Sequence, residues 1–418
     1  MKIAIDLRPL QMGHQDRGIG AYLLNILENL PESNNSSYIF VRYDTSNPIK
    51  DYSMVDIGEY REVLMRKKEI TKKIIPLISF AANSFFPNYR LLKKLKPDIY
   101  FQCDYLLGAP RIRGCKTIVV CHDIIPFIFK KLYLPDWKKY IWFGQMKNKT
   151  KIKFILVAIY NSLKYHRGRK LLNRANHVIA DSKNTRNDLV DKLNIEADKI
   201  SVIYPAASFM EGNGSKKINL AISEIFENKS IPVICYIGGT DKRRQVAELI
   251  YAFNLYNARV GDIKLILCGS DFDENSKRVD YSVKKAINLS SYQKNLIVLG
   301  HVSEAEKRFI LEKSTAFVFP TLYEGFGIPV IEAMICGTDV LTYKNSSIPE
   351  IAKSYPYYID RQDGYGIFSS LHSYFSIENP VKYDDIFIDK IKTQFNWGLS
   401  VKEIWSVFET SLKKGADR

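Results

Sequence analysis

Two glutamates stand eight positions apart around a glycine-bearing turn in the stretch "LYEGFGIPVIEAM" (322–334). The apolar run "AFVFP" before them predicts a strand, and Pro329 suits the first turn of a helix. Glu324 would then lie at the carboxyl end of a strand, where open α/β sheets bind ligands, and Glu332 about one turn into the helix. We therefore expect the two carboxylates to accept hydrogen bonds from different hydroxyls of one extended ligand.

The same turn favours a phosphate-bearing ligand. Gly325 and Gly327 allow backbone N–H groups to approach oxygen atoms closely, and the N-terminus of the following helix favours negative charge. Taken alone, either glutamate is more often structural, because loop carboxylates are usually solvated and a helix dipole favours an acid in the first turn. Their combination with the glycines and the proline at a strand end favours binding.

A second group of candidate residues follows the apolar run "VICYIGG", which ends in Gly238 and Gly239. The next residues, "TDKRRQ", place Arg243 and Arg244 just beyond the predicted strand end. Arginine can bind phosphate oxygens with two hydrogen bonds, and fixed cations stabilise charge on a phosphate leaving group without a metal. A short basic turn is as often merely solvated, but this position favours function.

Metal chemistry has little support in the sequence. The six histidines form no HExxH pattern and the six cysteines form no CxxC pair, so we expect no metal site and reduced, buried thiols. The stretch "DFD" (271–273) has the Asp-x-Asp spacing of a metal motif. We interpret its acids as helix caps in a loop.

Short apolar runs alternate with helix-length segments and must position these residues. Their continuous hydrophobicity is typical of parallel strands covered on both faces. Two successive units of this kind predict an α/β protein with two Rossmann-like, doubly wound domains that face a central cleft. We expect an N-terminal domain at 1–207, a C-terminal domain at 208–395 that begins with a polar linker, and an amphipathic helix at 396–418 that could cross back to the N-terminal domain. The expected strands are "KIAIDL", "YIFVRY", "DIYFQ", "TIVVCHD", "HVIADS", "SVIYP", "IPVICYIGG", "IKLILCGS", "LIVLG", "AFVFPT" and "TDVLTY".

The basic residues are concentrated in the first half of the chain. Residues 1–200 contain 35 Lys and Arg against 19 Asp and Glu, whereas residues 201–418 contain 26 of each. This asymmetry suggests an anionic partner such as a membrane surface, nucleic acid or a phosphorylated substrate. The longest apolar run, "FILVAIY" (154–160), has seven residues, which is too short for a membrane span. The N-terminus lacks the continuous apolar segment of a signal peptide, so we expect a cytoplasmic protein.

The stretch "EGFGIPVIEAMICGTDVLT", followed by "SSIPEI" (346–351), resembles the signature of retaining family 4 glycosyltransferases of GT-B fold, which carry a Glu-x7-Glu element in the C-terminal domain. "YIGGTDKRRQVAELIYAFN" (236–254) is similar to their segment with two glycines, an arginine, a lysine and an asparagine. "RGIGAY" (17–22), "VCHDIIPF" (120–127), "ADSKNTRNDL" and "VIYPA" resemble the N-terminal landmarks in order. The resemblance therefore spans nearly the whole chain.

This resemblance implies roles for most of the candidate residues. Glu324 would contact the hydroxyls of the transferred sugar and Glu332 the ribose of the nucleotide, while Arg243 and Arg244 would neutralise the diphosphate. Arg244 stands where the family usually has lysine, which keeps the charge but not the geometry. The expected catalytic residues thus include Glu324, Arg243 and Arg244, and the donor-binding set further includes Gly238, Gly239, Gly325, Phe326, Gly327, Ile328 and Glu332.

In the N-terminal half, the resemblance implies that Gly18 and Gly20 let the first loop reach the donor phosphate. "RGIG" alone is only half of a dinucleotide fingerprint, because Leu23 stands where a third glycine would fall. His122 ends a predicted strand, and without the resemblance we would interpret it as a histidine that hydrogen-bonds to backbone. With the resemblance, we expect His122 to be catalytic and close to the reacting sugar. Asp123 is expected to orient the loop or to help position the acceptor.

Together these features predict a retaining, metal-independent hexosyltransferase that needs no cofactor. The stretches "IDLRP…GIGAY" and "GGTDKRRQ" resemble bacterial polysaccharide mannosyltransferases, which implies a nucleoside diphosphate hexose as donor, with GDP-mannose the first choice. Retention in this family is usually explained by front-face attack, in which the leaving phosphate takes the acceptor's proton. We therefore expect no carboxylate base.

The expected acceptor is a growing, lipid-linked bacterial surface glycan such as a lipopolysaccharide O-antigen. The basic stretches at 66–80, 129–143 and 147–170 mix cations with apolar residues. This composition suits peripheral binding to the anionic inner face of the cell membrane, and also an ordinary solvated helix. Two alternatives stay open. One is a basic nucleic-acid-binding protein, although the sequence has no known nucleic-acid-binding pattern, and the other is a non-catalytic subunit that only binds the sugar nucleotide.

Overall fold

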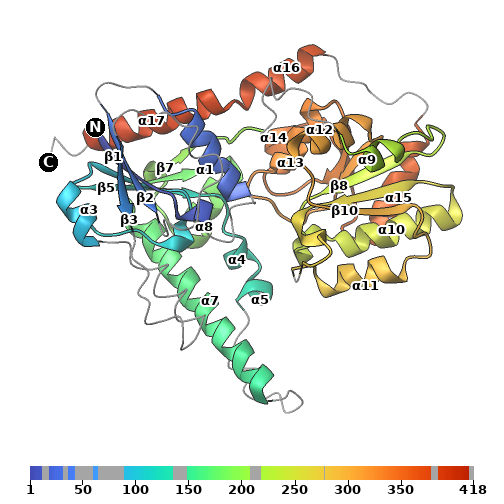
Figure 1. The fold of residues 1–418 in the computed structure, drawn as a ribbon, viewed down its shortest axis with the longest axis horizontal. Coiled ribbons are helices and arrows are strands. Elements are labelled where there is room, and N and C mark those ends of the chain that lie inside the picture. Colours follow the sequence, from blue (N-terminus) through green and yellow to red (C-terminus); the bar gives the residue numbers. More distant parts are fainter. Residues whose placement is uncertain are drawn as a thin grey trace. The chain divides into compact units, whose positions relative to one another are not determined.

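The chain folds into two compact units, residues 1–205 with 397–418 and residues 206–396, each built on its own parallel sheet (Figure 1). This arrangement confirms the predicted α/β class with two Rossmann-like domains. The computed structural model describes residues 1–11, 18–31, 36–42, 60–64, 89–134, 148–207, 218–276, 278–377 and 385–413.

The sheet of the first unit has the strand order β3-β2-β1-β4-β5-β6-β7, and each neighbouring pair is parallel. The chain runs outward from β1 to β3 and then returns to the other side of β1. The order therefore reverses between β1 and β4, the point at which doubly wound sheets bind their ligands. The strands are β1 (Lys2–Asp6), β2 (Ser37–Arg42), β3 (Tyr60–Leu64), β4 (Ile99–Gln102), β5 (Lys116–Cys121), β6 (His177–Ala180) and β7 (Ile200–Val202).

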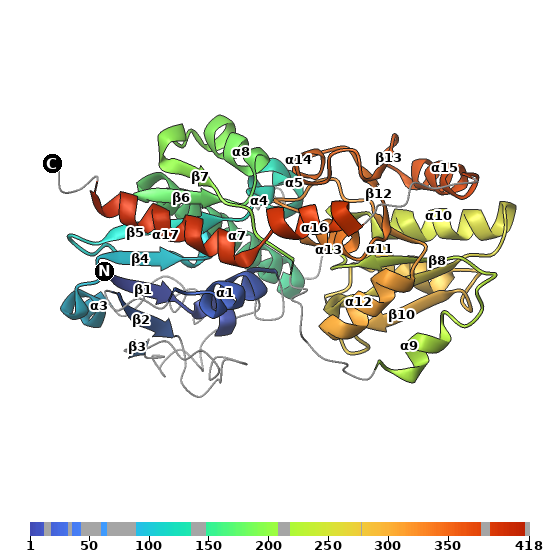
Figure 2. The same ribbon diagram turned by 90° about the horizontal axis from the view of Figure 1, so that it is seen from above.

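Helices cover both faces of this sheet (Figure 2). On one face, Val119 packs in a core with Leu171 of α7 and Leu189 of α8. On the other face, the ring of Phe101 meets that of Phe408 in α17, with centroids 5.2 Å apart. The helices are α1 (Gly18–Glu28), α3 (Tyr89–Leu95), α4 (Ile125–Ile128), α5 (Lys130–Tyr133), α7 (Asn148–Arg174), α8 (Lys183–Leu193) and α17 (Trp397–Lys413), with 3₁₀ turns η1 (Arg8–Gln11), η4 (Tyr105–Leu107) and η5 (Ala197–Lys199).

A buried ion pair fixes the loop after β1. The guanidinium of Arg8 donates to both carboxylate oxygens of Asp6, and neither residue is exposed to solvent. Arg8 also donates to the carbonyl oxygens of Leu107 and Gly108 at 2.9 and 2.7 Å. The hydroxyl of Tyr100 donates to Asp6 at 2.6 Å. These hydrogen bonds join the segments that follow β1 and β4, so the network holds together the two loops at the point where the strand order reverses.

The C-terminal helix α17 packs on the first unit. The indole of Trp397 is almost fully buried, and its ring lies edge-on to that of Tyr22 in α1, with centroids 5.3 Å apart. Ser400 donates its hydroxyl to the carbonyl of Tyr204 at 2.6 Å. The buried residues Ile404 and Phe408 continue the same face of the helix. The apolar stripe expected in this segment therefore docks α17 on the sheet that begins the chain.

The second unit repeats the topology with the strand order β10-β9-β8-β11-β12-β13. Every neighbouring pair is parallel, and the order reverses between β8 and β11. Helix α10 packs with α11 and α15, and α13 packs with α12, α14 and α16. The elements are β8 (Val233–Ile237), β9 (Lys264–Cys268), β10 (Leu296–Gly300), β11 (Ala316–Phe319), β12 (Asp339–Tyr343), β13 (Tyr357–Ile359), α9 (Leu220–Glu224), α10 (Val246–Arg259), α11 (Tyr281–Leu289), α12 (Glu304–Lys313), α13 (Ile328–Ile335), α14 (Ile348–Ala352), α15 (Gly364–Phe375) and α16 (Asp385–Gln394), with 3₁₀ turns η6 (Lys242–Arg244) and η7 (Ser270–Phe272).

All the strands expected from the sequence are present, and β3 and β13 are additional. Both lie at the outer edge of a sheet, where only one neighbour is available. The predicted linker is described only from residue 218 onward, and α9 soon follows. All six cysteines are free thiols, as expected, and four of them are buried.

We predict that Trp397→Ala destabilises the first unit by about 3–5 kcal/mol, because it removes a buried indole from the contact between α17 and α1. Urea denaturation followed by circular dichroism measures the change. Leu399→Ala, on an exposed position of the same helix, is the control and should shift stability by less than about 0.5 kcal/mol. Equal effects of the two substitutions would contradict the docking role.

Candidate active site

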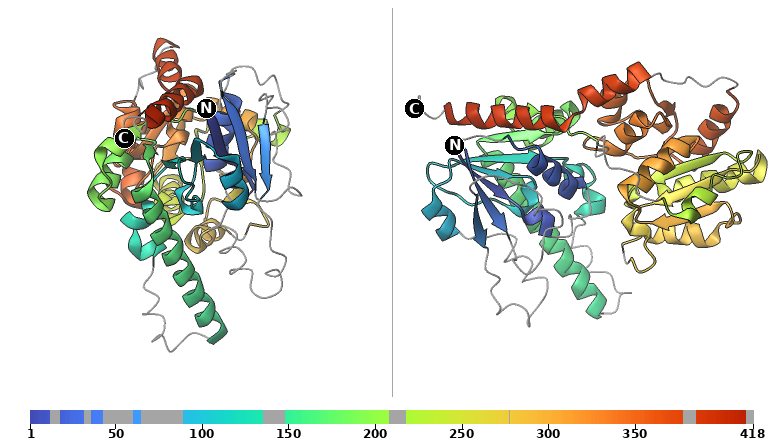
Figure 3. Two further views of the ribbon diagram at one scale, coloured as in Figure 1. Left: turned by 90° about the vertical axis from the view of Figure 1, so that its left-hand side faces the viewer. Right: turned by 45° about the horizontal axis from the view of Figure 1, so that its top comes forward.

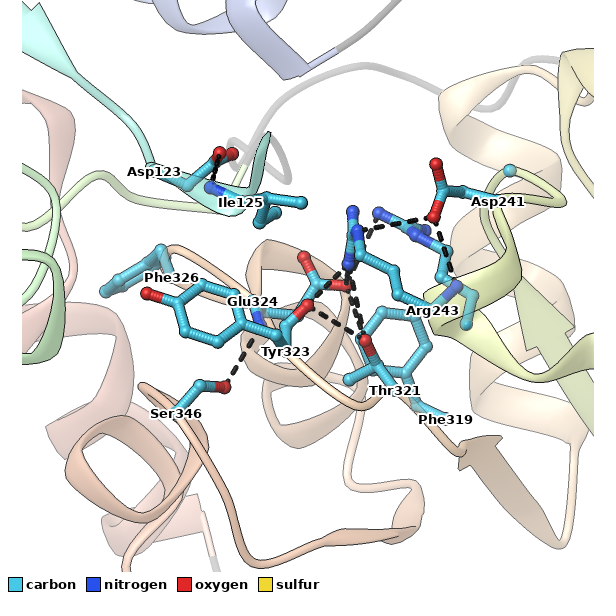
Figure 4. Close-up of polar contacts among 12 residues, drawn as sticks. Asp123, Ile125, Asp241, Arg243, Phe319, Thr321, Tyr323, Glu324, Phe326 and Ser346 are labelled. Atoms are coloured by element: carbon cyan, nitrogen blue, oxygen red, sulfur yellow. Dashed lines mark hydrogen bonds and ion pairs between the residues drawn. The ribbon is translucent and has the colours of Figure 1, made fainter. Parts of the chain in front are cut away.

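The predicted residues of the second unit gather where the strand order reverses. Strands β8 and β11 are neighbours in the middle of the sheet, so the loops at their carboxyl ends lie side by side. The loop after β8 carries Arg243 and Arg244. The loop after β11 carries Glu324, and Figure 4 shows its side chain beside that of Arg243. Open α/β sheets bind ligands at such a point.

Glu324 is held by an arginine from the neighbouring loop. One guanidinium nitrogen of Arg243 lies 2.5 Å from a carboxylate oxygen of Glu324, and the same nitrogen donates to the carbonyl of Tyr323 at 2.5 Å. The hydroxyl of Thr321 donates to this carboxylate oxygen at 3.0 Å. In return, the backbone N–H of Leu322 donates to the carbonyl of Arg243 at 2.8 Å. The two loops are therefore tied together by both side chains and backbone.

Arg244 supplies a second cation to the same carboxylate. Its guanidinium nitrogen lies 3.5 Å from Glu324, and its guanidinium carbon lies 5.3 Å from the centre of the Phe319 ring. Both arginines and Glu324 are largely buried. The side chain of Asp241, 3.8 Å from Arg243, is a more exposed acid at the edge of the cluster. Two guanidinium groups thus surround one buried carboxylate.

The partner charges, more than burial, set the pKa values of Glu324 and Arg244. Burial alone would raise the pKa of Glu324, but the fields of Arg243 and Arg244 outweigh burial and lower it. Burial would likewise lower the pKa of Arg244, but Glu324 and the Tyr236 hydroxyl raise it. All three groups are therefore charged at neutral pH, and the cluster of Arg243, Arg244 and Glu324 carries one net positive charge.

Glycines make room for this arrangement. A Cβ added to Gly238 would lie 2.2 Å from a guanidinium nitrogen of Arg244, so only glycine leaves space for this side chain. A Cβ on Gly239 would lie 2.8 Å from the Asp271 carboxylate. The predicted glycines of the first loop are therefore needed to fit side chains of the protein itself, whether or not a ligand also approaches them.

The turn before α13 is shaped by its own hydrogen bonds. Gly327 has a φ of +109°, which L side chains rarely adopt, and it is the residue that precedes the helix. The hydroxyl of Ser347 donates to the carbonyls of Glu324 and Phe326 at 3.0 and 2.6 Å. Ser346 accepts a hydrogen bond from the Glu324 N–H at 3.0 Å. Gly325 and Ile328 complete the turn, and Ile328 begins the helix at which the donor-binding backbone was expected.

Glu332 lies in α13 and is 3% exposed. Lys307 of α12 donates to its carboxylate at 2.7 Å and also contacts Glu304 at 2.7 Å. Burial would lower the pKa of Lys307, but the two glutamates raise it, so the lysine is charged. Sequence analysis missed Lys307 because a single lysine in a charged helix carries no pattern. Its position on the helix preceding β11 is the only signal that could have suggested it.

The interpretation of "DFD" as helix caps is wrong. Asp271 lies inside the 3₁₀ turn η7 and accepts a hydrogen bond from the Thr240 N–H at 2.9 Å, which fixes the loop that leads to Arg243. Asp273 accepts from the His301 N–H at 2.7 Å. Both acid side chains thus join loops and cap no helix N-terminus, although Asp273 occupies the C-cap position of η7. In the part of the chain that the structure describes, no three His, Cys, Asp or Glu side chains group as metal ligands would.

In the first unit, His122 follows β5 and pairs with Asp181, which follows β6. The His122 Nδ1 lies 2.6 Å from the Asp181 carboxylate, and Nε2 lies 2.9 Å from the carbonyl oxygen of Cys103. The ring of Tyr22 meets the imidazole edge-on, with centroids 4.8 Å apart. Sequence analysis named His122 but missed Asp181, although two neighbouring parallel strands end at the same edge of a sheet.

Both acceptors of His122 require a proton. The carbonyl oxygen of Cys103 can only accept, so Nε2 must carry a hydrogen. In a neutral ring, Nδ1 would then have no hydrogen, and its lone pair would face the Asp181 carboxylate. Burial lowers the pKa of His122, but Asp181 outweighs it and raises the pKa to about 9. His122 is therefore an imidazolium at neutral pH, and both of its nitrogens are bonded to the protein.

The remaining candidates of this unit lie at helix starts. The side chain of Asp123 accepts from the Ile125 N–H at 2.9 Å and so orients the turn into α4. Gly18 and Gly20 were expected in a loop, but they form the first turn of α1, so that expectation is corrected. A Cβ at Gly18 would meet nothing within 4 Å, so packing within the protein does not require glycine at this position.

We predict that His122 titrates near pH 9 and that Asp181→Asn moves its pKa down toward the ordinary value of about 6.5. Since the folded pKa is raised, the pair stabilises the protein fully below about pH 6.5 and less as pH rises through 9. NMR titration of the imidazole gives the pKa, and thermal unfolding between pH 6 and 10 gives the stability. A wild-type pKa near 6.5 would refute the pairing.

Both halves of the chain match family models. Residues 17–208 match the model described as "Glycosyltransferase Family 4", and residues 218–363 match the one described as "Glycosyl transferases group 1".

Relatives of known activity are distant. The chain is 24% identical over 384 residues to the serotype-specific mannosyltransferase WbdA of Escherichia coli, which covers 84% of this chain and 41% of that relative. It is 22% identical over 323 residues to the O-antigen chain mannosyltransferase B of Escherichia coli, covering 73% of this chain and 83% of that relative. The chain thus spans about two fifths of the length of WbdA.

Solved structures share the fold over the whole chain. Sucrose-phosphate synthase from Thermosynechococcus elongatus aligns with a TM-score of 0.64 at 15% identity, covering 98% of each chain. Anabaena HepE in complex with UDP and glucose aligns with a TM-score of 0.62 at 14% identity, covering 98% of this chain and 99% of that one. With family matches on both halves and this shared architecture, the chain belongs to the group 1 and family 4 glycosyltransferases of GT-B fold.

Proposed function

We propose that this chain is a retaining, metal-independent glycosyltransferase that moves a hexose from a nucleoside diphosphate sugar to a growing, lipid-linked surface glycan. The observation that carries the proposal is the cluster of Arg243, Arg244 and Glu324 at the carboxyl ends of β8 and β11. Its net charge and its position match the needs of a diphosphate leaving group.

The two arginines provide the electrostatic part of catalysis. Negative charge develops on the diphosphate as its bond to the sugar breaks, and preorganised cations stabilise that charge without having to move. Glu324 already holds Arg243 and Arg244 in place before a donor arrives. The net positive charge of the cluster is then available to the diphosphate, which explains how the reaction could proceed without a divalent ion.

The two glutamates divide the rest of the donor between them. Glu324 has hydrogen-bond capacity for sugar hydroxyls next to the arginines, and Glu332 in α13 would accept from the ribose. Lys307, whose Nζ lies 2.7 Å from the Glu332 carboxylate, orients that carboxylate. The backbone N–H groups at the start of α13 face a position where negative charge is favoured.

The acceptor side depends on groups of the first unit. In the proposed front-face mechanism the leaving phosphate takes the acceptor's proton, so none of the carboxylates has to act as a base. His122 would assist as a fixed cation held by Asp181. For a sugar hydroxyl to bind Nε2 directly, that hydroxyl would replace the carbonyl of Cys103. Asp123 orients the adjoining turn.

Mannose is the first choice for the transferred sugar. Two of the relatives reported above are named mannosyltransferases, and a third, from Salmonella typhimurium, is named an O-antigen chain mannosyltransferase at 22% identity over 279 residues. GDP-mannose is therefore the donor to test first, and an O-antigen-like glycan the acceptor.

Helix α7 supports peripheral binding to an anionic membrane. Its 27 residues include eight Lys and Arg and no acid. Ile152, Leu156 and Leu163 are exposed and lie on one face of the helix, since they are spaced by four and seven residues. Figure 3 shows the first half of α7 extending beyond the sheet of its own unit. No helix in the described ranges is long and apolar enough to cross a bilayer. The basic stretch 66–80, and 129–143 beyond Leu134, lie outside the described residues.

A panel of nucleotide sugars in a thermal-shift assay, with and without EDTA, tests the donor. We predict that one donor, GDP-mannose first, raises the melting temperature equally in both buffers. Glu332→Ala should abolish that shift, because it removes the ribose acceptor. Glu304→Gln removes the other partner of Lys307 and should keep the shift, which makes it the matched control. Stabilisation that disappears in EDTA would contradict metal independence. No response to any donor would contradict the proposed glycosyltransferase function.

For the leaving-group role, we predict that Arg244→Ala lowers kcat about 10²–10³-fold while KM for the donor changes much less. Steady-state release of nucleoside diphosphate measures both constants. Arg244→Lys, which keeps the charge but not the two-pronged geometry, should recover part of the rate. An unaltered kcat in Arg244→Ala would remove the assignment.

For the membrane, we predict that the protein floats with vesicles rich in phosphatidylglycerol but not with neutral vesicles, since each cation near an anionic surface adds about 1 kcal/mol. Leu156→Glu combined with Leu163→Glu should abolish flotation, because the apolar face of α7 could no longer enter the lipid interface. Leu289→Glu, at an exposed position of α11, should leave it unchanged. Equal flotation with both kinds of vesicle would refute the electrostatic attraction.

A further inference from the structure

A cavity of about 390 Å³ lies at the amino edge of the sheet in the first unit. Arg111 and Arg113 line it from the loop before β5, and Thr117 from the start of β5. Arg174, at the end of α7, and Asn176, just before β6, line it from the other side. His122 follows the carboxyl end of β5, so the cavity and the candidate active-site residues of this unit lie at opposite edges of one sheet. The arginine cavity is therefore separate from the site already described.

The charged side chains that line this cavity are all of one sign. Its lining contains three guanidinium groups and no carboxylate. Arg111 and Arg113 are exposed, and among the described residues neither side chain forms an ion pair or a hydrogen bond. Arg174 is partly buried and donates to the carbonyl of Ala109. Burial lowers the pKa of Arg174, and the nearby Arg111 lowers it further, which is the mark of two cations that repel each other.

Ordinary structural needs explain only part of this arrangement. Arg174 is the last residue of α7, where a cation interacts favourably with the helix dipole. The same reason does not apply to Arg111 and Arg113, which belong to a loop between β4 and β5. Three cations that line one hollow repel one another, although water and salt screen much of the repulsion at the exposed Arg111 and Arg113. An anion bound in the hollow would be attracted to all three.

The other lining groups are suited to a phosphate. Asn176 uses its side-chain oxygen to accept from the Thr117 N–H at 2.8 Å, so its remaining polar group is the N–H₂ donor. The hydroxyl of Thr117 can donate as well. Guanidinium groups prefer planar, two-pronged hydrogen bonding to phosphate oxygens, and a cavity of this size accommodates a phosphate or a diphosphate.

We propose that the arginine cavity is a second anion site, which binds the phosphate or diphosphate group of a ligand at the amino edge of the N-terminal sheet. The site does not depend on the proposed donor. A soluble phosphate compound bound there would act on the enzyme from outside its active site, and a lipid headgroup bound there would fix the first unit at the end of α7.

Calorimetric titration with inorganic diphosphate, in the full chain and without metal, tests the site. We expect two binding events in the wild type. Arg111→Ala with Arg113→Ala should weaken one of them about tenfold or more, since charge-assisted hydrogen bonds are lost. Arg243→Ala with Arg244→Ala should remove the other and keep the first, so failure of the donor site and failure of the arginine cavity are separate results.

The matched control is Arg169→Ala with Lys170→Ala, which removes two exposed cations from α7 outside the cavity. The dissociation constants of both binding events should stay within about twofold of the wild type, because salt screens the effect of distant charges. The proposal is overturned if the cavity variant binds like this control, or if all binding disappears with the donor-site variant.

Flotation distinguishes the two sources of phosphate. If the ligand is a lipid headgroup, the wild type should prefer phosphatidic acid over phosphatidylglycerol at matched surface charge, and the cavity variant should lose this preference. If the ligand is soluble, flotation of the cavity variant should match that of the charge control while its diphosphate titration stays weakened.

Discussion

One electrostatic constraint organises the second unit, the buried carboxylate of Glu324 between the guanidinium groups of Arg243 and Arg244. Leaving any one of these charges without its partners in a largely buried position would cost several kcal/mol, so the loops after β8 and β11 must stay together. Two largely buried cations face one buried anion, and the further acid beside Arg243, Asp241, is more exposed and so more screened by water. The buried part of the site is therefore electropositive before any ligand arrives. A donor diphosphate would then complete a charge balance that the protein leaves incomplete.

The surrounding structure serves this constraint. Gly238 leaves room for the Arg244 guanidinium, and Asp271 fixes the loop that presents both arginines. Ser347 and the positive φ of Gly327 set the turn from Glu324 into α13. The first unit follows the same design with a histidine, since Asp181 holds His122 as a cation at the carboxyl edge of its sheet. In both units, side chains at strand ends are fixed by charged partners from a neighbouring strand end.

Sequence reasoning predicted the strands of both sheets because continuous apolar runs such as "LILCG" are distinctive. It missed β3 and β13, since edge strands need little hydrophobicity. It predicted Arg243 and Glu324 as members of one site but not their ion pair, because 81 residues separate them and only the strand order makes them neighbours. Lys307 and Asp181 were missed for the same reason. Each is a single charged residue whose meaning comes from its partner.

A crystal structure with a bound nucleoside diphosphate, grown without divalent ions, would show whether the two arginines hold the leaving group. We predict diphosphate oxygens within hydrogen-bonding distance of both Arg243 and Arg244, with the ribose hydroxyls on Glu332 and no metal in the site. A nucleotide bound away from the ends of β8 and β11, or one whose phosphates bind only after a divalent ion is supplied, would contradict it.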